Sequence, residues 1–157
     1  MASKTPPLPS ETTLKIKRTY AAPRDKVFRA WTDPKELTSW FAPSNDYSTP
    51  LAEVDLRVGG SYRIQMKTAD GVTYTVKGAY REVRPPERLV FTWAWVGEPC
   101  GGRGLTEFYD TLVTLEFRTV PEGTEMIVRH EYFLSKDERD KHREGWTGCL
   151  DRLSKVL

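Results

Sequence analysis

Alternation of apolar and polar residues is the dominant pattern of this chain. From residue 12 onward, short runs alternate with a period of two, which puts every second side chain on one face of a β-strand. Between Ser61 and Thr68, for example, Tyr62, Ile64 and Met66 share a face. The pattern predicts strands over residues 12–20, 61–68, 72–83, 89–96, 111–120 and 124–133.

Short turns join most of these strands. Asp70-Gly71 is a two-residue hairpin signal, and Pro121 to Gly123 forms another tight connection. Strands that follow one another through tight turns pair as an antiparallel meander, with one apolar face that must be covered. Residues 42–55 are expected to form a loop. Residues 97–104, with four glycines and one proline, are expected to form a mobile loop near a pocket mouth.

Three segments have helical spacing instead. Two short helices are predicted after the first strand, one beginning at Pro23 and one capped by Asp33 with Pro34 at its first position. The third runs from Ser135, with Glu138 completing a capping box, to the last residue. Its second half is apolar on one face, which contains Trp146, Leu150, Leu153 and Leu157.

This order of elements predicts an α+β domain. A curved antiparallel sheet of about six to seven strands would wrap around the long C-terminal helix, with the two short helices after the first strand. Because such a sheet is larger than the helix, a cavity is expected between them. The domain would span residues 12–157, after a flexible tail over residues 1–11.

Composition excludes several classes of protein. The 24 basic and 22 acidic residues are interspersed and leave a net charge of only +2, which argues against nucleic acid as a partner. No apolar run reaches the length of a membrane span, and residues 1–11 lack the apolar stretch expected of a signal peptide. Two cysteines, Cys100 and Cys149, give no disulfide framework, so the chain is expected to be cytoplasmic.

Large aromatic residues on both the sheet and the last helix suggest a cavity with flat walls. About half of them are expected to be ordinary core. Gly145 and Gly148 interrupt the helix and indicate a close approach to the sheet or to a ligand. The candidate ligand-binding residues are Trp40, Phe41, Tyr62, Met66, Phe91, Trp93, Trp95, His130, His142, Trp146 and Leu150.

The two histidines have two interpretations. His130 is in phase with Met126, Val128 and Tyr132 and is expected to point inward, and His142 lies one turn before Trp146. Both fit structural, hydrogen-bonded histidines at the edge of a pocket. Alternatively, one of them meets a polar group of a ligand or transfers a proton. No metal-ligand spacing, cofactor motif or catalytic residue is identified.

The chain also resembles a known family. The resemblance is densest in the C-terminal helix and covers about residues 12–157. The matching motifs are Ala21-Ala22-Pro23, Val27-Phe28-Arg29-Ala30-Trp31-Thr32-Asp33-Pro34, Leu37, Trp40-Phe41, Val58-Gly59-Gly60-Ser61-Tyr62-Arg63, the run from Gly78 to Trp93 and the run from His142 to Leu153. They are similar to the SRPBCC superfamily, and most closely to the group named after the C-terminal domain of the activator of heat-shock protein 90 ATPase.

The resemblance implies a helix-grip, or START-like, fold and leaves three functions open. The first is binding or carriage of a small hydrophobic or aromatic molecule in the cavity. The second is a stand-alone co-chaperone-like module with a chaperone partner and a role in the stress response. The third is a cyclase- or hydrolase-type enzyme that uses a pocket histidine. A monomer or a homodimer is expected.

Overall fold

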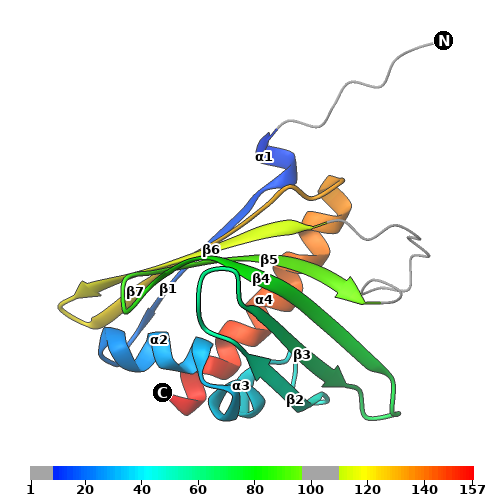
Figure 1. Ribbon diagram of the computed structural model, residues 1–157, viewed down its shortest axis with the longest axis horizontal. Coiled ribbons are helices and arrows are strands. Elements are labelled where there is room, and N and C mark those ends of the chain that lie inside the picture. The colour runs from blue at the N-terminus through cyan, green and yellow to red at the C-terminus, as the bar shows by residue number, and fades with distance from the viewer. Residues whose placement is uncertain (1–8, 97–109) are drawn as a thin grey trace.

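The computed structural model describes residues 9–96 and 110–157 (Figure 1). These residues form three short helices, seven strands and one long helix. Their bounds are α1 Pro9–Thr12, β1 Leu14–Tyr20, α2 Arg24–Thr32, α3 Pro34–Trp40, β2 Ser48–Val54, β3 Ser61–Lys67, β4 Thr73–Arg84, β5 Arg88–Val96, β6 Thr111–Val120, β7 Gly123–Glu131 and α4 Lys136–Val156.

The strands form one curled antiparallel sheet in the order β1-β7-β6-β5-β4-β3-β2. Each strand from β2 to β6 pairs with the next strand along the chain, while β1 closes the far edge by pairing with β7, so that Leu14 lies opposite His130. The long helix α4 crosses one face of the sheet, and α2 and α3 lie at the end near the C-terminus (Figure 1). The predicted α+β helix-grip fold is confirmed.

Two predictions of local structure are wrong. Residues 42–55 are not all loop, because β2 pairs with β3 and places Ala52 opposite Ile64. The alternation in β2 is weak since it is an edge strand, the position in a sheet that tolerates Pro50. Residues 9–11, predicted to belong to a loose tail, lie in α1, where the Ser10 carbonyl accepts a hydrogen bond from Arg139 at 2.6 Å.

Tyr132 also departs from its predicted phase. The strand β7 ends at Glu131, and Tyr132 has a positive φ of 73° with 64% of its surface exposed. This turn of the backbone brings the next side chain, Phe133, into the core, where it is 3% exposed. The Phe133 N–H donates to the Thr12 carbonyl at 3.1 Å. The period of two therefore breaks because the chain is redirected toward α4.

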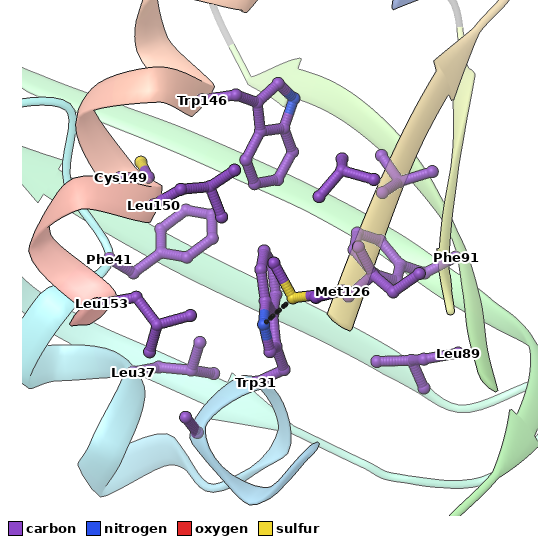
Figure 2. Packing of buried hydrophobic residues seen from close by; sticks show 14 of the residues in the cluster. Trp31, Leu37, Phe41, Leu89, Phe91, Met126, Trp146, Cys149, Leu150 and Leu153 are labelled. Carbon is purple, nitrogen blue, oxygen red and sulfur yellow. Dashed lines mark hydrogen bonds between the residues drawn. The ribbon is translucent and has the colours of Figure 1, made fainter. Parts of the chain in front are cut away.

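Aromatic side chains fill the end of the domain that holds α2 and α3. Trp31 of α2 lies at the centre of this cluster, between Leu153 of α4 and Met126 of β7 (Figure 2). Its Nε1–H donates to the Met126 sulfur at 3.1 Å, and its ring centroid lies 4.8 Å from that of Trp40. The second half of α4 packs on this cluster, so the solid part of the core lies toward the C-terminus.

The two glycines of α4 have different surroundings. A Cβ added to Gly148 would lie 1.8 Å from the Pro43 carbonyl oxygen, so this glycine allows the helix to approach the segment after α3. This confirms a close approach, although its partner is a loop rather than the sheet. A Cβ at Gly145 meets nothing within 4 Å. Gly145 therefore borders open space, and no close approach requires it.

This difference predicts opposite effects of the same substitution. Gly148→Ala should lower the free energy of unfolding by about 1–3 kcal/mol, because the new methyl group overpacks against backbone that cannot rotate away. Gly145→Ala should raise it by roughly 0.5–1 kcal/mol, the usual helix-propensity difference. Urea unfolding of both variants measures the two changes, and equal effects would contradict the assigned contacts.

Candidate functional site

An apolar pocket opens between the first half of α4 and strands β3, β4 and β5. It lies on the side of Trp146 away from the solid core, and its walls are almost entirely carbon. The segment after α3 closes the remaining side. The lining residues are Phe41, Pro43, Tyr47, Met66, Tyr74, Trp93, Trp95, Lys141, His142, Gly145, Trp146 and Cys149.

The size of the pocket depends on where its mouth is drawn. All the space between its walls and mouth amounts to about 550 Å³, but this includes volume continuous with solvent. The space that the centre of a water molecule can reach is about 60 Å³. The smaller value excludes solvent outside the mouth and is the better guide to an occupant. One water needs roughly 10–15 Å³ on that scale, so a body of one or two rings matches the interior.

Flat aromatic rings form the inner walls. The ring centroids of Trp93 and Trp146 lie 5.0 Å apart, and those of Trp93 and Trp95 lie 5.5 Å apart with perpendicular planes. Phe41 meets Trp146 edge to face at 6.0 Å. These distances are within the favourable range for aromatic pairs, so the rings support one another around the space that they enclose.

His142 is held in one tautomer by its two hydrogen bonds. The Trp95 Nε1–H lies 3.0 Å from His142 Nε2, and an indole can only donate, so Nε2 accepts. The proton of the neutral ring must therefore be on Nδ1, which lies 2.8 Å from the Glu138 carbonyl oxygen and donates to it. Both ring nitrogens of His142 are occupied within the protein.

His130 repeats the arrangement deeper in the core. Trp146 Nε1–H donates to His130 Nδ1 at 3.0 Å, so the proton sits on Nε2, 2.6 Å from Thr111 Oγ1. The Thr111 hydroxyl in turn donates to the Trp93 carbonyl at 2.9 Å. Burial lowers the pKa of His130 well below its ordinary value, because the charged form of the ring would lose its hydration. The imidazole is therefore neutral and fully hydrogen-bonded.

Six of the eleven candidate ligand-binding residues meet at this pocket. They are Phe41, Met66, Trp93, Trp95, His142 and Trp146. The other five lie elsewhere. Trp40, His130 and Leu150 are fully buried in the core, whereas Tyr62 and Phe91 line a separate void, in which the centre of a water molecule can reach only about 20 Å³.

Several residues that line the pocket are not among the eleven candidates predicted from the sequence. Tyr74 could have been included, since it shares its strand phase with Val76 and Tyr80. Lys141, Gly145 and Cys149 follow one another at intervals of four along α4, so helical spacing from Gly145 would have found the other two. Pro43 and Tyr47 lie in the segment before β2 and have no periodic signal.

Cys149 supplies a thiol to the pocket wall. Burial raises the pKa of the Cys149 thiol to about 12, so the group stays protonated at neutral pH. In this state the thiol acts as a small apolar group of the wall. Cys100 and the expected mobile loop over 97–104 lie outside the described residues.

Across residues 9–96 and 110–157, no three side chains among His, Cys, Asp and Glu come together as a metal site. None of the described helices combines the length and apolar character needed to cross a bilayer.

Comparison with known proteins identifies the family. The model of the family described as "Activator of Hsp90 ATPase homolog 1-like protein" matches residues 21–157. The chain belongs to this family. The resemblance noted in the sequence is thereby confirmed over most of the domain. A search of the curated proteins found no match.

Solved structures of similar proteins have the same fold as this activator-homologue family member. A protein from Chromobacterium violaceum is 25% identical, with a TM-score of 0.78 over 92% of this chain and 96% of that one. An AHSA1-like protein from Aeromonas hydrophila is 26% identical, with a TM-score of 0.74 over 91% and 90% of the two chains. The AHSA1 protein from Silicibacter pomeroyi, at 23% identity and a TM-score of 0.79 over 92% and 96%, supports the fold alone.

The neutral state of His130 predicts a pH-dependent stability. Because its pKa is lower in the folded protein than the ordinary value of about 6.5, the unfolded chain binds this proton more readily. Stability is therefore complete above about pH 6.5 and falls as the pH drops below it. Between about pH 7.5 and pH 5.5 the loss should be on the order of 1 kcal/mol for this one group.

Urea unfolding of the wild type and His130→Gln at both pH values checks this. The variant will be less stable at either pH, but its free energy of unfolding should fall less on acidification. The same dependence on pH in both proteins would show that His130 does not titrate on unfolding.

Proposed function

We propose that this protein binds a small planar apolar molecule in the pocket beside α4, as a carrier or ligand-responsive protein. The supporting observation is the set of four aromatic rings, Phe41, Trp93, Trp95 and Trp146, that faces one open-mouthed space. Aromatic walls with few polar groups are typical of sites for small molecules.

The walls are organised before any ligand arrives. Trp95 and Trp146 are each fixed by an indole hydrogen bond to a histidine, and neither ring can fold into the space without leaving an imidazole nitrogen unpaired. An unpaired buried polar group costs roughly 1–3 kcal/mol. Gly145 adds no side chain that could fill the space from the helix side. Preorganised walls reduce the cost of binding.

The same hydrogen bonds weigh against an enzyme that uses a pocket histidine. A general base needs a free lone pair within reach of its substrate. The lone pair of His142 accepts from Trp95, and that of His130 accepts from Trp146. Proton transfer by either imidazole would first have to break the indole contact that holds the wall in place.

A chaperone-linked role is the second candidate, and the family description favours it. Stimulation of Hsp90 ATPase activity by the purified protein tests this role directly, and the lack of any stimulation would remove it. The two candidate roles can be tested separately. Gly145→Leu fills the pocket from inside, so it should affect ligand binding but not a surface that contacts a chaperone. Cytoplasmic location, a role in the stress response and a monomeric or homodimeric state remain predictions.

Filling the pocket should weaken ligand binding. Gly145→Leu places an isobutyl group in the open space beside Trp146 and should weaken binding of a neutral probe, 2-naphthamide, by at least about tenfold, equivalent to roughly 1.4 kcal/mol. The matched control is Thr147→Leu, which adds a leucine to the exposed side of the same helix. Isothermal titration calorimetry measures both affinities.

Three outcomes are decisive. Weak binding by Gly145→Leu together with wild-type binding by Thr147→Leu supports the pocket. Equal affinity in all three proteins would place the probe elsewhere on the surface. No binding to the wild type would remove a neutral two-ring ligand from consideration.

A further inference from the structure

We propose that the ligand is an aromatic carboxylic acid, with its ring body between the tryptophans and its carboxylate paired with Lys141 at the pocket mouth. This inference rests on the proposed ligand-binding function and names the chemical class of the ligand. Its starting point is the charge of the pocket. Among the lining residues that the structure describes, Lys141 is the one with a full charge, since His142 accepts a hydrogen bond at Nε2 and donates one from Nδ1, and no aspartate or glutamate is among them.

Lys141 has the position expected of an anchor at the rim. It lies on α4 one turn before Gly145 and is partly buried, so its alkyl stem covers the apolar wall. A buried ammonium without a partner would be costly, whereas a lysine can keep its charged end in water at the edge of an apolar surface. The ammonium group of Lys141 is therefore expected at the pocket mouth, and its methylene groups form part of the wall.

The carboxylates of α4 with recorded ion pairs have partners other than Lys141. Asp140 pairs with Arg139 at 2.8 Å, and Asp151 pairs with Arg18 at 2.6 Å. None of the ion pairs found among the described residues includes Lys141. A ligand carboxylate can thus pair with this lysine without displacing an internal salt bridge.

A second group in the same walls also requires an acceptor. Trp93 Nε1 is the one buried side-chain nitrogen or oxygen in the described part of the chain that has no hydrogen-bond partner. An indole N–H can only donate. Lys141 and Trp93 are both hydrogen-bond donors, so both favour a ligand with oxygen atoms that accept hydrogen bonds. Neither would favour a cationic ligand.

A carboxylate suits this site better than a phosphate ester. One lysine balances the single charge of a carboxylate, whereas a phosphate monoester brings a charge of about −1.5 to −2 at neutral pH. A carboxylate bonded directly to a ring is also flat, like the space between the indole rings. These two properties select an aromatic acid.

The test compares two probes of nearly equal shape, 2-naphthoate and its neutral amide, 2-naphthamide. The wild type should bind the acid about fivefold more tightly than the amide, the difference expected of one partly exposed ion pair. Lys141→Gln should bind both with equal affinity, because the charge that distinguishes the acid from the amide has no partner in this variant. Lys155→Gln, an exposed lysine in the last turn of α4, is the control and should keep the preference. Raising the salt to about 0.5 M should reduce the preference, since the pair is at the solvent edge.

Each result has one meaning. If neither probe binds the wild type, the proposed binding function fails. If both bind equally, or if Lys141→Gln keeps the preference for the acid, the ligand-binding function stands and the anionic ligand is refuted. If 2-naphthyl phosphate binds more tightly than 2-naphthoate, the anion is a phosphate and the assignment to a carboxylate is overturned.

Discussion

Two hydrogen bonds from indole to imidazole hold α4 against the sheet, and the pocket depends on them. Trp146 of α4 donates to His130 of β7, and Trp95 of β5 donates to His142 of α4. The bonds cross the helix–sheet interface in opposite directions. Each lies in a partly or fully buried place where an unpaired nitrogen would be costly. The spacing between helix and sheet is therefore set by directional bonds as well as by the fit of apolar side chains.

The helix consequently has two ends with different properties. Toward the C-terminus, Leu150 and Leu153 pack into the aromatic cluster around Trp31, and the Tyr20 hydroxyl donates to the Leu150 carbonyl at 3.0 Å. Toward the N-terminus, Gly145 leaves open space where the sheet curves away. A solid core at one end supports a hollow at the other. This division explains why substitutions one turn apart, at Gly145 and Gly148, have opposite expected effects.

Much of the fold could be predicted from the sequence, because a period of two reports which face of a strand is buried. Strand β6, for example, has Val113, Leu115 and Phe117 in phase, and all three are buried. The edge strand β2 was not predicted because its alternation of apolar and polar residues is weak. Periodicity gives the direction of a side chain but not its distance from the opposite wall. Phe41 and Trp40 are neighbours in sequence and both buried, yet only Phe41 borders the pocket. Lys141 was missed because it lies in the polar half of α4, where a lysine side chain is usually exposed to solvent.

The protonated thiol of Cys149 gives the pocket a chemical property of its own. Because the thiolate is the nucleophilic form and the pKa of this thiol is about 12, almost none of it is reactive at neutral pH. An occupant with an electrophilic carbon, such as an unsaturated ketone, would lie beside sulfur without being captured by it. If the proposed ligand is electrophilic, the protonated thiol leaves it unmodified, whereas an activated cysteine in the same wall would form a covalent bond with it.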